Sequence, residues 1–267
     1  MATSPPPESP PGAEMVLLPE EVPCVDHLVT EDDTPVDSLF AEKQQRLLTE
    51  LLYSSWPGPG EGRPFLVAAN VGIFYSPKKA PLVPDVFLSL DVVAPDDLLA
   101  KNHRLYFMWE FEKPPDAAVE IVSDKRGDEE GFKFQTYAKI GVPYYVIWDP
   151  RNLLGKGPLR AFSLRGKTYV PLQEAWLQDV GLGLTIWRGT FEESEGVWLR
   201  WCDERGQVIP TGAERADEER QRAEHERRDR ESAEQRAEQE CRAKEEAARR
   251  AERLAAQLRA LGLDPEA

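Results

Sequence analysis

Two short apolar runs separated by a helix-like segment constrain this chain more than any other feature. Residues 115–123 read PDAAVEIVS and residues 142–150 read VPYYVIWDP. Short, apolar and aromatic runs of this kind are typical of strands buried inside an α/β sheet. The segment between them opens with turn residues, carries apolar residues at near-helical spacing and ends at Gly141, as helices often do. The order strand, helix, strand predicts a mixed α/β sheet with a helix crossing one of its faces.

One charged residue interrupts the first of these runs. Glu120 stands in the middle of the predicted strand, where burying a carboxylate is costly. The side chain therefore either reaches a solvated edge or has a partner that offsets the lost hydration. Such a partner is a cation, a metal ion or a backbone donor.

The segments around this block predict further elements of a single domain. Residues 37–56, DSLFAEKQQRLLTELLYSSW, have leucines at helical spacing, with Asp37 or Ser38 as the N-cap. Strands are expected in residues 64–75, 84–93 and 103–112. Short apolar pieces between residues 158 and 202 are expected to form antiparallel strands that extend or cover the sheet.

The two ends of the chain differ from this domain in composition. Residues 1–35 are rich in Pro, Glu and Asp and are expected to be a disordered arm, residues 36–205 the folded domain, and residues 206–267 mainly a long charged helix. That helix is predicted from Ala213 to about Ala260, where Gly and Pro are absent. Its heptad pattern of apolar residues is interrupted by charges, so a solvated helix and a dimer-forming coiled coil both stay open.

Composition excludes several classes of function. The formal net charge of -15 rules out a surface that binds DNA or anionic membranes through general basicity. Any nucleic-acid function would need a local basic groove or bound metal ions. Apolar stretches long enough to span a membrane and a signal-peptide pattern are both absent, which predicts a cytoplasmic protein. The three cysteines and three histidines are scattered, which argues against a zinc site or a disulfide framework.

Three residues form a candidate site. Asp85 begins one predicted strand, Glu120 lies in another, and Lys133 follows on the next helix. Two carboxylates on adjacent strands suit Mg²⁺, which prefers one or two carboxylates together with water and substrate phosphate. An ammonium group beside them could orient a water or offset charge on a phosphoryl group. A purely structural ion pair between Glu120 and a neighbouring cation is the competing interpretation.

The order and spacing of the blocks PDVFLSLDV, PDAAVEIVSDK and GFKFQTYAKIGVPYYVIWDP resemble the Uma family of predicted bacterial endonucleases. This family is a branch of the PD-(D/E)XK restriction-endonuclease-like superfamily. The resemblance covers about residues 35–200. It implies a restriction-endonuclease-like mixed β-sheet flanked by helices, here followed by the long C-terminal helix.

The resemblance also implies roles for individual residues. Asp85 and Glu120 match the two acidic metal ligands, and the backbone carbonyl of Ile121 would be a third ligand. The superfamily's lysine stands two residues after the second acid, where this chain has Val122. In this branch Lys133 of the following helix matches that lysine, with Tyr137 one turn further along. The implied cofactor is Mg²⁺, with Mn²⁺ as a substitute.

Two functions follow as hypotheses. The first is a metal-dependent endonuclease that hydrolyses phosphodiester bonds of nucleic acid, expected to be DNA, with Asp85, Glu120 and Lys133 as catalytic residues. The alternative is a catalytically inactive protein of the same fold. It would act as an interaction or oligomerisation module through its C-terminal helix, for example as a homodimer.

Overall fold

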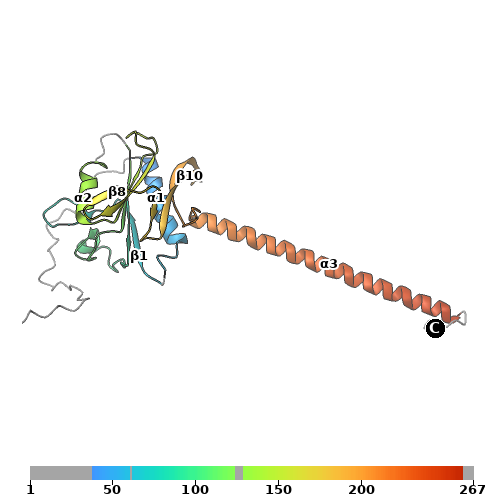
Figure 1. The fold of residues 1–267 in the computed structure, drawn as a ribbon. Helices are drawn as coiled ribbons and strands as arrows, with labels where there is room; N and C mark the ends of the chain where they lie inside the picture. Colours follow the sequence, from blue (N-terminus) through green and yellow to red (C-terminus); the bar gives the residue numbers. More distant parts are fainter. Residues whose placement is uncertain (1–37, 61, 124–128, 261–267) are drawn as a thin grey trace, which may run out of the picture. The chain divides into compact units, whose positions relative to one another are not determined.

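The computed structural model of the chain describes residues 38–60, 62–123 and 129–260 (Figure 1). The chain divides into two compact units, one ending at Thr211 and the other beginning at Gly212, and each is described by itself. The expected N-terminal arm lies outside the described residues.

A six-stranded mixed sheet forms the centre of the first unit. Its strands are β1 (Phe65–Ala69), β3 (Val86–Leu90), β5 (Ala117–Ile121), β6 (Tyr144–Trp148), β7 (Leu159–Arg165) and β8 (Thr168–Pro171), and they follow the order β1-β3-β5-β6-β7-β8. Strands β5 and β6 are parallel, whereas the other neighbouring pairs are antiparallel. Helix α2 (Phe132–Ile140) connects β5 to β6 and ends at Gly141, whose φ of 91° suits glycine. The α/β fold with a crossover helix is therefore confirmed.

The two faces of this sheet are buried by different helices. Helix α1 (Leu39–Ser55), capped by the Ser38 hydroxyl, places its buried leucines in one apolar core together with Val119 and Ile121 of β5. Tyr137 of α2 belongs to a second core on the opposite face, together with Ala118 of β5. Successive side chains of a strand point to opposite faces. Glu120 therefore points towards α2, on the same face as Ala118.

Two smaller sheets complete the first unit. Strands β9 (Trp176–Leu177), β10 (Leu182–Phe191) and β11 (Ser194–Cys202) form an antiparallel sheet, and β2 (Ile73–Phe74) pairs in parallel with β4 (Tyr106–Phe107). The three-stranded sheet shares its apolar core with α1, so the C-terminal strands both extend and cover the central sheet.

Two predicted strands differ from the expectation: residues 64–75 form the two strands β1 and β2 in different sheets, and a second predicted strand is much shorter than expected. Residues 103–112 form only the two-residue strand β4, preceded by a short 3-10 helix η1 (Lys101–His103). The chain turns after Phe107, and the ring of Phe111 folds back to stack on Tyr106 at 4.4 Å between ring centroids. This aromatic contact replaces continued strand pairing.

The second unit is helix α3 (Gly212–Ala260), which confirms the predicted long C-terminal helix. Every residue from Arg215 to Leu254 is exposed within the single chain. Ion pairs between residues four positions apart recur along it, for example between Glu224 and Arg228. Within the part of the chain that the structure describes, no helix combines the length and apolarity that crossing a membrane requires.

Candidate active site

Strand register brings the two predicted acidic residues face to face. The pairing of β3 with β5 aligns Val86 with Val119. One further residue along this antiparallel register, Asp85 stands opposite Glu120. Directly opposed residues in antiparallel strands have Cβ atoms about 4.5–5.5 Å apart, and like charges at such positions repel. The sheet therefore holds two like charges close together, and a positive charge nearby would stabilise them.

Helix α2 supplies one such charge and one hydroxyl donor. Lys133 Nζ donates a hydrogen bond to Glu120 Oε2 at 2.7 Å, and the Tyr137 hydroxyl donates to Oε1 at 3.0 Å. The two residues lie four positions apart and so occupy the same face of the helix. Glu120 is only 1% exposed. The cost of burying a carboxylate inside an apolar strand is therefore offset, because both of its oxygens accept hydrogen bonds.

Burial shifts the acid–base properties of this cluster. The pKa of Glu120 is raised to about 8, because desolvation and the nearby charge of Asp85, which raise it, outweigh Lys133 and the Tyr137 hydroxyl, which lower it. Burial alone would lower the pKa of Lys133, but the carboxylates of Glu120 and Asp85 outweigh it and the pKa is raised. Burial also raises the pKa of Tyr137, which stays a neutral donor. Lys133 is therefore a lasting cation, while Glu120 would become fully ionised only with further positive charge nearby.

Asp85 is oriented by two groups from different parts of the fold. The backbone N–H of Ile121 donates to Asp85 Oδ2 at 2.7 Å, and Gln45 Nε2 of helix α1 donates to Oδ1 at 2.6 Å. Gln45 is in turn held by Asn70, whose Nδ2 donates to Gln45 Oε1 at 2.9 Å. Asn70 follows β1 with a positive φ of 54°. This chain of contacts links α1, β1 and β3 at one end of the sheet.

Gln45 and Asn70 were missed by the sequence analysis. A signal for Gln45 existed, because Gln44 and Gln45 share the buried side of α1 with its leucines. Gln44 instead bonds both backbone groups of Leu199 at 2.8 Å, which joins α1 to β11. Asn70 carried no comparable signal, because its left-handed backbone and its partner depend on distant segments.

The predicted third ligand also faces this site. In an extended strand, the N–H and C=O groups of one residue point to the same side. The Ile121 N–H points to Asp85, so the Ile121 carbonyl lies on the β3 side as well. Two residues beyond the last aligned pair, the register places Pro84 opposite Ile121, and proline has no N–H to donate to this carbonyl.

The position of the superfamily's lysine holds a buried apolar side chain here. Val122 is 2% exposed and belongs to the apolar core beneath α2, and its backbone N–H donates to the Trp148 carbonyl at 2.8 Å. The ammonium group of Lys133 reaches the same carboxylate from the helix above. The structure therefore brings together Asp85, Glu120, Ile121 and Lys133.

The donor set fits a hydrated Mg²⁺ ion better than a cation enclosed by protein ligands. Each carboxylate oxygen has two lone pairs, so one hydrogen bond leaves capacity for a metal bond. Mg²⁺ binds through one or two carboxylates and keeps several waters. Across the described ranges, no group of three or more His, Cys, Asp or Glu side chains could hold a metal ion. Two opposed carboxylates and one backbone carbonyl match the Mg²⁺ pattern, and a cation there would favour the ionised form of Glu120.

Comparison with known proteins gives one match. The family model Uma2, described as "Putative restriction endonuclease", matches residues 32–179, which is more than half of the chain. The matched range includes Asp85, Glu120 and Lys133, and it ends before β10. Neither the curated proteins nor the solved structures contain a match to this chain.

Proposed function

Because the chain belongs to the Uma2 family of restriction-endonuclease-like proteins, we propose that it is a metal-dependent endonuclease that hydrolyses DNA. The observation that carries the proposal is the cross-strand pair of Asp85 and Glu120, with the ammonium group of Lys133 at 2.7 Å from Glu120. An ion pair kept only for stability would need one carboxylate. The second, repelling carboxylate has a purpose if both bind a cation.

Each residue of the cluster has a role in this proposal. Asp85, Glu120 and the Ile121 carbonyl would bind Mg²⁺, or Mn²⁺ in its place. Such an ion lowers the pKa of water and neutralises charge on a phosphate. Lys133 would orient the attacking water or stabilise negative charge that develops on the phosphoryl oxygens. Gln45 and Tyr137 are positioning residues, because each donates a hydrogen bond to one of the two carboxylates.

The acidic net charge of the chain weighs less against DNA binding than it first suggests. Residues 1–37 contain nine Asp and Glu residues and no Lys or Arg. Residues 38–211 contain 23 acidic against 20 basic residues, and residues 212–267 contain 16 against 13. The domain that carries the site is thus close to neutral. A bound divalent cation would shift its local balance further towards a phosphate backbone.

The inactive interaction module remains the second candidate function. It is favoured by α3, whose exposed length could pair with a second copy of the chain. The site argues against it, because all four oxygens of the two carboxylates keep polar partners. A protein that no longer needed the site would gain from replacing a buried ion pair with apolar side chains.

A cleavage assay tests the proposal. Purified protein is incubated with supercoiled DNA, single-stranded DNA and RNA in Mg²⁺ or Mn²⁺, beside Glu120→Gln and Lys133→Ala. The matched controls are Glu42→Gln, a partly exposed acid of α1, and Lys139→Ala, an exposed lysine of α2. Wild type and both controls should nick DNA, and the two site variants should lose at least about a hundredfold in rate.

Thermal unfolding separates metal binding from catalysis. Mg²⁺ should raise the unfolding temperature of the wild type and of Lys139→Ala, and this increase should disappear in Glu120→Gln. A metal response without cleavage of any nucleic acid would support a cation-binding interaction module. Equal cleavage by all five proteins would point to a contaminating nuclease and contradict the assigned roles.

A further inference from the structure

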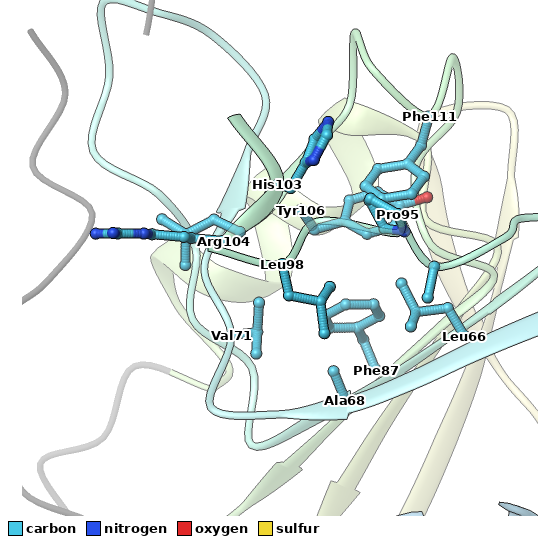
Figure 2. A pocket seen from close by; sticks show the side chains of 12 residues that line it. Leu66, Ala68, Val71, Phe87, Pro95, Leu98, His103, Arg104, Tyr106 and Phe111 are labelled. Atoms are coloured by element: carbon cyan, nitrogen blue, oxygen red, sulfur yellow. The ribbon is translucent and has the colours of Figure 1, made fainter. Parts of the chain in front are cut away.

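A cavity of about 270 Å³ lies on the face of the central sheet to which the two carboxylates point, and Phe87, two residues after Asp85 in the chain, lines it. Figure 2 shows its base formed by Ala68 and Phe87, with Val71 and Leu98 on one side and Leu66 on the other. Residues 94–105 supply much of the rest of its lining. The cavity belongs to the first unit and is independent of α3.

The walls of the cavity suit a flat apolar group. Phe111 and Tyr106 stack with an interplanar angle of 10°, and Phe87 meets Tyr106 edge-on at 5.1 Å between ring centroids. The Tyr106 hydroxyl is engaged by Ser89 at 2.9 Å and by the Lys113 carbonyl at 3.2 Å. This aromatic wall is therefore held rigidly and presents carbon to the cavity.

The polar side chains at the rim point elsewhere. Arg104 Nε donates to the Leu99 carbonyl at 2.9 Å, and His103 Nδ1 lies 2.7 Å from the Asp97 carbonyl oxygen. In Figure 2 the guanidinium of Arg104 and the imidazole of His103 both extend away from the cavity. A ligand would thus be recognised by its flat faces, while its polar edges stay at the opening.

The position of the cavity relates it to the candidate active site. Phe87 is aligned with Ala118, and Glu120 follows two residues later on the same face of β5. Phe87 and Glu120 are therefore diagonal neighbours, which lie about 7–8 Å apart. A phosphate held at the carboxylates would leave the base of the same or the adjoining nucleotide within reach of the cavity.

We propose that the cavity receives one unstacked nucleobase, from the nucleotide next to the phosphate that is cleaved. The inference rests on the proposed nuclease function and adds a substrate class to it, namely nucleic acid with an unpaired base at the cleavage site. The volume lies just below the roughly 300–1,000 Å³ of pockets for drug-sized ligands, so it suits a single heterocycle. Stacking on aromatic side chains accepts any base, so base identity would matter little.

Two matched substitutions test this inference in the full-length protein. Ala94 lines the cavity and is exposed at its rim, so Ala94→Trp would block the opening with little effect on folding. The neighbouring Val93 is 70% exposed and lies outside the lining, so Val93→Trp adds similar bulk elsewhere. Equal unfolding temperatures for the two variants and the wild type would establish that both are folded.

The readout is the affinity for a short fluorescein-labelled oligothymidine, measured by anisotropy in Ca²⁺. A series of the same oligonucleotide lacks the base at each position in turn. Loss of the critical base should weaken binding to the wild type and to Val93→Trp about tenfold. Ala94→Trp should bind the intact strand about tenfold more weakly than the wild type does, and should not distinguish it from the abasic strand.

Equal affinity of the wild type for intact and all abasic strands would overturn the inference, as would identical binding by the two tryptophan variants. Different results would contradict the proposed nuclease function. If the wild type neither binds oligonucleotides nor cleaves DNA or RNA, both proposals fall. If it cleaves a fully paired duplex and one with an unpaired base at equal rates, only the base-binding cavity is excluded.

Discussion

The ion pair between Lys133 and Glu120 and the one between Arg228 and Glu224 have nearly the same length, 2.7 Å and 2.6 Å. Their surroundings differ. The Glu120 side chain is 1% exposed, whereas those of Arg228 and Glu224 are 69% and 49% exposed. Exposed pairs contribute little to stability because water and salt screen them, whereas breaking a buried pair leaves a charge without compensation. Burial, rather than distance, distinguishes the first pair from the second.

The largest expected effect comes from breaking the buried pair. Lys133→Met keeps the aliphatic stem and removes the charge beside Glu120. At pH 9, above the pKa of about 8 for Glu120, the free energy of unfolding should fall by about 3 kcal/mol. At pH 6 the loss should be smaller, because Glu120 is then protonated. Chemical denaturation at both pH values measures this, and an equal loss at the two would contradict the assignment.

A somewhat smaller effect concerns the pH dependence of the metal-free protein. The pKa of Glu120 is raised from 4.5 to about 8 on folding, so the folded state binds more protons between these values. Stability is then fully present below pH 4.5 and decreases as the pH rises towards 8. Relative to Glu120→Gln, the wild type should lose stability steadily over this window in EDTA. If the stability of the two proteins depends on pH in the same way, a group other than Glu120 titrates in this window.

The neighbouring glutamines of α1 differ in the same way, because one contacts the candidate site and the other contacts only the structural core. Gln45→Leu removes a donor from Asp85 and should weaken Mg²⁺ binding about tenfold, or about 1.4 kcal/mol, as loss of a second-shell partner commonly does. Gln44→Leu is the matched control. It should lower the unfolding temperature, because Leu199 loses two buried bonds, and leave Mg²⁺ affinity unchanged. Calorimetric titration with Mg²⁺ measures the affinity of both variants. Weaker Mg²⁺ binding by Gln44→Leu, with unchanged binding by Gln45→Leu, would contradict the assigned roles.

The smallest effect is expected on α3. Arg228→Ala removes one exposed ion pair and should change the free energy of unfolding by less than about 0.5 kcal/mol, even in low salt. The cleavage rate should stay at the wild-type value. A loss above about 1 kcal/mol would show that this face of α3 is buried in solution, as pairing with a second copy of the chain would require. Light scattering would then determine the oligomeric state.

Much of the fold could be predicted because its signals are local. The Ser38 N-cap, the leucine spacing of α1, the Gly141 C-cap and the two apolar strands around α2 each involve a few consecutive residues. The predicted strand at residues 103–112 was wrong in length, since Phe111 packs back on Tyr106 and no partner strand extends β4. Local propensity cannot show whether a strand has a neighbour to pair with.

By itself, the sequence determined the helices, most of the strands and the residue types able to bind a metal ion, because periodicity, caps and charges in apolar runs are local properties. Only the tertiary structure decided that Asp85 stands opposite Glu120, that Gln45 and Asn70 hold Asp85, and that an aromatic cavity lies beside them. These relations depend on strand register and on segments far apart in the chain. They arise when the sheet pairs and α1 packs on it, and no short stretch of sequence encodes them.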